Sequence, residues 1–155
     1  MATRLENPPA PNLAIGWDVG GWHCERNPRS RDALVILDHQ IRLLGQPWRG
    51  NLRSVLAGEG GTAEWVHRIL RLCQVEDPVS DWPVVLAIDT PLGFPEAFRS
   101  LLNAGRALRD PGDWNTNRYL YRYTERYLFR HGWRPMSPLK DMIGSQSSKG
   151  LHALA

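Results

Sequence analysis

The feature that most restricts the fold of this chain is a continuous apolar segment that ends in a carboxylate. Residues 83–89 read Pro-Val-Val-Leu-Ala-Ile-Asp, and their β-branched residues favour an extended strand. Pro83 begins the segment, and Pro91 follows two residues after Asp89, so a proline marks each end. A continuously apolar strand of this kind is usually central in an α/β sheet and covered on both faces.

Apolar spacing predicts three further strands and three helices. The strands are residues 13–18, 33–37 and 41–44, and the helices are residues 62–73, a helix that opens at Pro95, and residues 114–131. Residues 46–61 and 144–150 are predicted loops, the first with a short helical piece near residues 52–57. The first three strands form an antiparallel meander, and the right-handed crossover rule returns the fourth parallel to the first. The predicted fold class is α/β, a mixed sheet flanked by helices in one domain over residues 13–155.

Composition narrows the class of protein without naming a partner. Apolar residues make up 42% of the 155 residues, enough for a core. The net charge of +3 is a mild basic bias that permits an anionic partner without requiring one. Two cysteines are too few for a disulfide scaffold, and no apolar run is long enough to span a bilayer. We expect a cytoplasmic protein, with no membrane partner and with residues 1–12 as a flexible Pro-rich leader.

Asp18 and Asp89 form the candidate functional centre. Each ends an apolar strand and precedes a turn that contains Gly or Pro. If the two strands are parallel neighbours, both carboxylates emerge at the same edge of the sheet, where α/β proteins bind ligands. Two close carboxylates repel each other unless a cation lies between them, and Mg²⁺ or Mn²⁺ is the natural cofactor. The alternative is that each Asp only forms a turn or caps the next helix.

The sequence around these aspartates resembles a known family. Residues 15–22 (Ile-Gly-Trp-Asp-Val-Gly-Gly-Trp) and 87–95 (Ala-Ile-Asp-Thr-Pro-Leu-Gly-Phe-Pro) resemble the two strand ends of the uncharacterised RNase H-like family known as domain of unknown function 429. Residues 121–126 resemble the family's R-x-T-[DE] segment, and residues 136–138 and 143–144 resemble the family's next segment along the chain. The resemblance implies an RNase H-like fold and a predicted nuclease activity, with divalent metal held by Asp18 and Asp89.

The resemblance also implies parts that this sequence does not show. In RNase H proper a third acid lies on the first helix, and Glu64 is the nearest candidate metal ligand here. Its place in the first turn of a helix is explained equally by the helix dipole. The usual fifth strand and last helix have no counterpart before Ala155, so we expect an incomplete domain with strand four as an exposed apolar edge. A second copy of the chain is one candidate cover for that edge.

Basic residues in the second half supply candidate substrate contacts. Arg118, Arg122, Arg126 and Arg130 recur every four residues beside three tyrosines, and such a stripe suits phosphate and base contacts. We expect Arg122 and Arg126 to bind substrate phosphate, assisted by Lys140. The alternative is that the tyrosines face the core and the arginines are solvated or paired with acids such as Glu125.

These patterns are compatible with three functions. The first is a divalent-metal-dependent nuclease with nucleic acid as its partner. The second is a nucleotide-binding phosphotransferase-like module of the actin or sugar-kinase type, in which Gly20 and Gly21 would present backbone N–H groups to phosphate. The third is a non-catalytic binding or assembly module.

Overall fold

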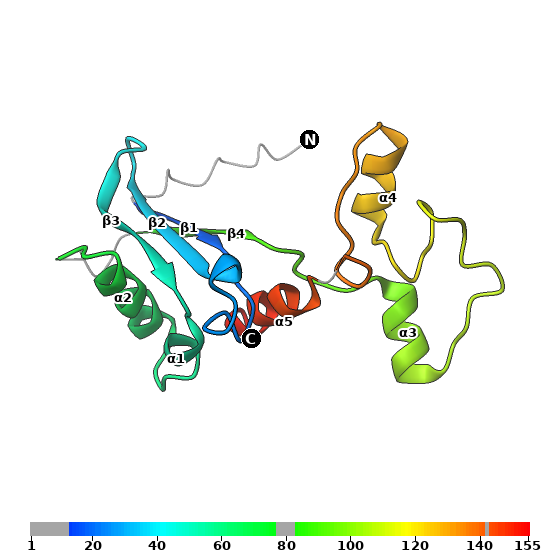
Figure 1. Cartoon of the computed structure of the whole chain (residues 1–155), viewed down its shortest axis with the longest axis horizontal. Helices are drawn as coiled ribbons and strands as arrows, with labels where there is room; N and C mark the ends of the chain where they lie inside the picture. The colour runs from blue at the N-terminus through cyan, green and yellow to red at the C-terminus, as the bar shows by residue number, and fades with distance from the viewer. Residues whose placement is uncertain (1–12, 77–82, 142) are drawn as a thin grey trace, which may run out of the picture. The chain divides into compact units, whose positions relative to one another are not determined.

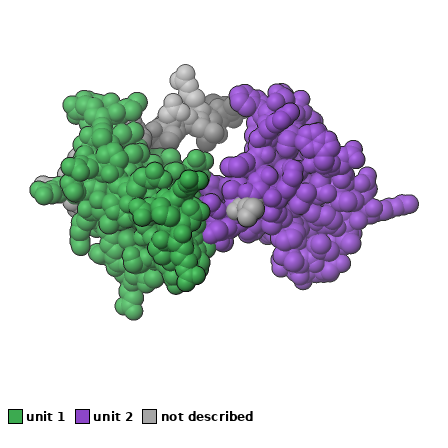
Figure 2. All heavy atoms as spheres, in the orientation of Figure 1, with its two compact units in different colours: residues 1–89 green, residues 90–155 purple. Residues whose placement is uncertain are grey.

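The computed structural model describes residues 13–76, 83–141 and 143–155, and the predicted leader lies outside these ranges. The chain divides into two compact units, Met1–Asp89 and Thr90–Ala155, where the sequence predicted a single domain (Figure 2). We refer to them as unit 1 and unit 2. Among the described residues, no helix has the length and apolar character needed to cross a bilayer.

Unit 1 contains a four-stranded mixed sheet whose strand order is β3-β2-β1-β4 (Figure 1). The strands are β1 Leu13–Asp18, β2 Asp32–Asp38, β3 Leu43–Gly50 and β4 Val84–Asp89. Strands β1, β2 and β3 form the antiparallel meander, and β4 pairs parallel to β1. The α/β class and this topology are confirmed. Strand β4 lies at an edge of the sheet, with Val85 48% exposed, and not in the central position that is usual for such a strand. The expectation of an exposed apolar edge at strand four is confirmed.

One face of the sheet carries the core of unit 1. Ile15 and Trp17 on β1 share this face with Leu34 and Ile36 on β2, and all four are buried. Helix α2, Thr62–Leu72, lies against the sheet (Figure 1) and buries its predicted apolar residues, Ile69 and Leu70 among them. The Trp17 and Trp65 rings lie 6.4 Å apart between centroids and join helix to strand. The helix predicted at residues 62–73 is confirmed.

The segment between β2 and α2 differs from its prediction. Strand β3 runs to Gly50, into the predicted loop, and it includes Pro47 because an edge strand tolerates a residue without an N–H. Helix α1, Arg53–Leu56, matches the short helical piece expected there. Gly45, at a φ of +60°, brings β3 against the end of α2, where a Cβ would lie 2.1 Å from the Cys73 carbonyl oxygen.

Both cysteines are buried free thiols. Cys73 lies at the end of α2, and burial raises the pKa of its thiol. Cys24 lies within hydrogen-bond reach of the Gly50 carbonyl oxygen, at 3.4 Å. The two cysteines therefore do not form a disulfide with each other.

The Asp32 carboxyl group is the polar centre of unit 1. It is completely buried on the apolar face of β2. Its Oδ1 accepts hydrogen bonds from the Trp17 indole N–H at 3.0 Å and the Gly20 backbone N–H at 2.7 Å, and its Oδ2 accepts one from the Leu52 N–H at 2.8 Å. These bonds compensate the loss of water around a buried carboxyl group. One side chain thus joins β1, the turn after β1 and the entry to α1.

Removal of this acceptor tests its weight in stability. We expect Asp32→Ala to lower the free energy of unfolding by about 3–5 kcal/mol, since three buried N–H groups lose their acceptor. Asp32→Asn keeps one oxygen but turns an amide N–H₂ toward the Leu52 N–H, and we expect it to cost about 1–3 kcal/mol. Urea unfolding measures both, with exposed Glu59→Gln as the control. A cost below about 0.5 kcal/mol for Asp32→Ala would contradict this role.

Unit 2 has three helices in its described residues, joined by long turns (Figure 1). They are α3 Glu96–Ala104, α4 Tyr123–Arg130 and α5 Gly144–Ala153. The helix predicted at residues 114–131 is wrong in its first half, where residues 114–116 and 118–120 form only turns. The extended backbone of Arg122, with a ψ of 174°, separates these turns from α4. The loop predicted at residues 144–150 is instead part of α5.

Candidate functional site

Asp18 and Asp89 lie side by side at the carboxyl ends of two parallel strands. They are partners in the β1–β4 register, and neighbouring strands lie about 4.8 Å apart. Both side chains are exposed to solvent. Because side chains alternate along a strand, Asp18 faces away from the helix-covered side on which Trp17 is buried. The predicted juxtaposition of the two aspartates is thus present, on the open face of the sheet.

Small residues surround the two carboxylates on this open face. A hollow of about 440 Å³ is lined by Asp18 and Asp89 together with residues from β1, β2 and β4. Gly16 and Ala87 pair beside them, and Ala33 pairs with Asp18 across β2. A Cβ at Gly16 would lie 2.8 Å from a Val35 methyl carbon, so glycine allows the Val35 side chain to lie over this position.

Glu64 does not join the two aspartates. It lies on α2, the helix that covers the opposite face through the Trp17–Trp65 contact, and it pairs with Arg68 at 3.3 Å. Within the described residues, no group of three or more His, Cys, Asp or Glu side chains is arranged to hold a metal ion. The helix-dipole explanation of Glu64 therefore fits better than the role of third ligand.

Gly20 and Gly21 use their N–H groups within the chain. The Gly20 N–H donates to Asp32, and the Gly21 N–H donates to the Ser30 carbonyl oxygen at 3.0 Å. A Cβ at Gly20 would lie 2.4 Å from that same Ser30 oxygen. The glycines thus allow this turn to approach the backbone before β2. Their N–H groups, which the predicted phosphate loop would use to bind phosphate, donate to Asp32 and Ser30 instead.

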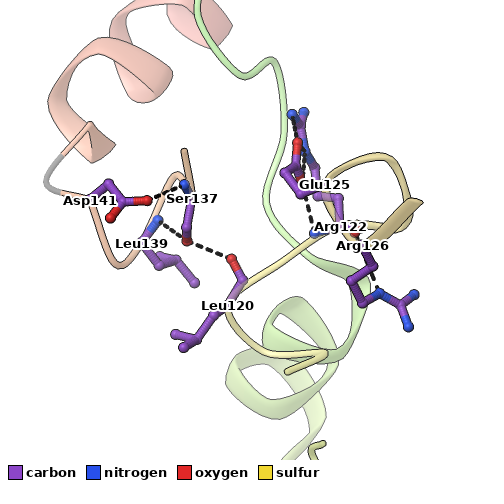
Figure 3. Close-up of polar contacts among 7 residues, drawn as sticks. All are labelled: Leu120, Arg122, Glu125, Arg126, Ser137, Leu139 and Asp141. Carbon is purple, nitrogen blue, oxygen red and sulfur yellow. Dashed lines mark hydrogen bonds and ion pairs between the residues drawn. The ribbon is translucent and has the colours of Figure 1, made fainter. Parts of the chain in front are cut away.

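Arg122 and Glu125, from the family-like segment, pair with each other at the start of α4 (Figure 3). Glu125 is buried and accepts a hydrogen bond from the Arg122 backbone N–H at 2.8 Å. Its carboxylate also accepts from the Arg122 Nε at 3.0 Å and forms an ion pair with the Arg122 Nη2. Arg122 therefore pairs with an acid of the chain, Glu125, which is the alternative to the expected phosphate contact.

Arg126 differs from Arg122 because its guanidinium is not paired with Glu125. Figure 3 shows its side chain turned away from that pair, with the Nε donating to the Arg122 carbonyl oxygen at 3.4 Å. Arg126 and Arg122 line a cavity of about 500 Å³ within unit 2, together with Arg106 and Arg118. Three arginines of the predicted stripe thus line one cavity, whereas Arg130, at the end of α4, does not.

Lys140 does not itself line this cavity, but it contacts Tyr121, which does. Its ammonium group donates a hydrogen bond to the Tyr121 hydroxyl at 3.2 Å, and this contact raises the pKa of Lys140. Lys140 therefore stays charged at neutral pH, but its observed contact is within the chain.

Ser137 is a structural residue that sequence reasoning missed (Figure 3). It is fully buried, its hydroxyl donates to the Leu120 carbonyl oxygen at 2.6 Å, and the same oxygen accepts from the Leu139 and Lys140 N–H groups. Its own N–H donates to Asp141 at 2.6 Å. The sequence signals at this position were the Ser-Pro step at residues 137–138, which is typical of a turn, and the family resemblance of residues 136–138.

Comparisons with known proteins do not assign this chain to a family. Neither the scan against protein-family models nor the searches of curated proteins and solved structures found a match. The resemblance to an RNase H-like family therefore stays a prediction.

The Arg122–Glu125 pair gives a stability prediction. We expect Glu125→Ala to lower the free energy of unfolding by about 2–3 kcal/mol, because it removes a helix cap and leaves the half-buried Arg122 without its partner. Circular dichroism during urea unfolding measures the loss. Glu96→Ala, in the exposed first turn of α3, is the control and should change stability by less than about 0.5 kcal/mol. Equal losses in the two variants would contradict a special role for Glu125.

Proposed function

We propose that this protein is a divalent-metal-dependent phosphodiesterase of the RNase H-like class that acts on nucleic acid. The observation that carries the proposal is the register of Asp18 with Asp89 at the carboxyl ends of parallel strands. Strand ends of this kind are where α/β sheets bind ligands. The strand order and directions are also those that the family resemblance implies.

The donor set suits Mg²⁺ or Mn²⁺. Both cations prefer oxygen ligands, and Mg²⁺ in proteins is commonly held by one or two carboxylates, with waters and substrate phosphate in its other positions. Asp18 and Asp89 provide two exposed carboxylates on neighbouring strands. A third protein ligand is therefore not required for binding, although two ligands make the site weaker and more dependent on substrate.

The residues of the site have distinct tasks in this proposal. Asp18 and Asp89 bind and orient the cation, which when bound activates water and stabilises charge on the leaving oxygen. Gly16, Ala33 and Ala87 leave room for the substrate backbone beside the carboxylates. Asp32 acts at a distance by fixing Trp17 and Gly20, the residues on either side of the Asp18 turn.

Assembly through β4 is the second candidate function. Within the described residues, β4 pairs only with β1, and its outer edge is open. Val84 and Val85 are 38% and 48% exposed, and an exposed apolar edge is a template for pairing with another strand. A homodimer joined at this edge would give the protein a non-catalytic role. The nucleotide-binding alternative has no such support, because Gly20 and Gly21 donate within the chain.

Calorimetric titration of Mn²⁺ tests the metal site. We expect saturable binding to the wild type and roughly tenfold or more weaker binding to Asp89→Asn, a nearly isosteric change that removes one of two carboxylates. Asp113→Asn, at an exposed position of unit 2, is the matched control and should bind as the wild type does. In EDTA, Asp89→Asn should be as stable as the wild type or slightly more stable, since like charges on paired strand positions are destabilising.

Two results would contradict the proposal. One is equal Mn²⁺ binding by the wild type and Asp89→Asn, which would place any metal elsewhere. The other is wild-type metal binding without cleavage of any single-stranded, duplex or branched nucleic acid, which would leave a metal-binding protein without this activity.

A further inference from the structure

Positive charge is concentrated in unit 2. Residues 90–155 contain ten Lys and Arg residues against five Asp and Glu residues, whereas residues 1–89 contain nine against eleven. The overall charge of +3 therefore hides a basic unit and a slightly acidic one. An uneven distribution of this kind is the electrostatic pattern of a surface that binds an anionic polymer.

Four arginines of unit 2 line its cavity. Arg106 and Arg118 are exposed, and among the described residues neither side chain has an ion-pair partner. Arg126 joins them, and Glu96 is the one acid in the lining. Like charges gathered in one place repel one another unless anions neutralise them. Guanidinium groups bind phosphate oxygens in forked geometry, which makes phosphate groups suitable ligands for these arginines.

An aromatic surface begins at the same cavity. Tyr123 lines the cavity and is 68% exposed, and Tyr127, one helical turn later on α4, is 46% exposed. The two rings are stacked with centroids 6.5 Å apart, and the His131 ring comes next, 4.2 Å from that of Tyr127. The Arg130 guanidinium lies 5.9 Å from both tyrosine ring centres. The interpretation that these tyrosines face the core is wrong for Tyr123 and Tyr127.

We propose that unit 2 binds single-stranded nucleic acid, with its phosphates at Arg106, Arg118 and Arg126 and its bases stacked on Tyr123 and Tyr127. We call these five residues the strand-binding surface. This inference rests on the proposed function, which makes nucleic acid the substrate. It adds that the bound nucleic acid is single-stranded. Unpaired bases expose faces that stack on aromatic rings, and that stacking tolerates any sequence. A duplex buries those faces between its own base pairs, so it would use only the arginines.

Fluorescence anisotropy of a labelled twelve-nucleotide oligothymidine tests the inference in EDTA. We expect tighter binding of this strand than of a duplex of equal length. Tyr123→Leu with Tyr127→Leu should weaken binding about tenfold or more, because stacking on two rings is lost. The same pair should leave the salt dependence of binding unchanged, since no charge is removed. Trp133→Leu, which removes a ring that is 67% exposed and outside the strand-binding surface, is the matched control.

A second pair of variants tests the arginines. Arg106→Gln with Arg118→Gln should lower the salt slope of log binding constant by about 1.4, since each phosphate contact on a single strand contributes about 0.7. Arg99→Gln with Arg109→Gln removes the same charge from exposed positions of unit 2 outside the cavity lining. That control should change the slope by much less.

Three outcomes would overturn the inference. They are no binding in EDTA at low salt, equal affinity for strand and duplex, and full competition by thymidine monophosphate at the same nucleotide concentration, which would indicate a mononucleotide site. Because no metal is present, a failed Mn²⁺ titration with intact strand binding contradicts only the nuclease proposal. The reverse result contradicts only the strand-binding surface.

Discussion

The arrangement of unit 1 depends on one buried carboxyl group. Asp32 holds Trp17 on one side of Asp18 and Gly20 on the other. With Trp17 fixed in the core, the two-residue alternation of β1 turns the Asp18 side chain to the open face of the sheet. The register of β1 with β4 then places Asp89 beside it. The candidate metal site is thus positioned by a residue that does not belong to it.

Much of this fold could be predicted because its signals are local. Apolar runs that end in Asp marked β1 and β4, and helical spacing marked α2, so the topology and the Asp18–Asp89 pair could be derived from connection rules. Asp32 was missed because an acid at a strand start is typical of a turn residue. A signal was present, since Asp32 shares its strand face with Leu34 and Ile36, where an acid is buried only with hydrogen-bond partners.

The second half of the chain was harder to predict because charge and aromatic spacing imitated a helix. Arginines every four residues fit a helical stripe, but the turn capped by the Asn117 side chain ends at the extended backbone of Arg122. The capping box then starts α4 after Arg122. Spacing identified three of the four arginines that line the cavity but missed Arg106, because the cavity forms from a turn, a helix end and the loop that carries Arg106.

The opposite net charges of the two units match the two ligands proposed for them, a divalent cation and a nucleic acid strand. A site that holds a divalent cation must be rich in carboxylates, and carboxylates repel the phosphates of a nucleic acid. A surface that holds phosphates must be rich in guanidinium groups, which repel a cation and pair with nearby carboxylates, as Arg122 does with Glu125. Asp18 and Asp89 belong to the acidic unit, whereas the strand-binding surface belongs to the basic one. Each proposed ligand is thus assigned to the unit whose net charge is opposite to its own.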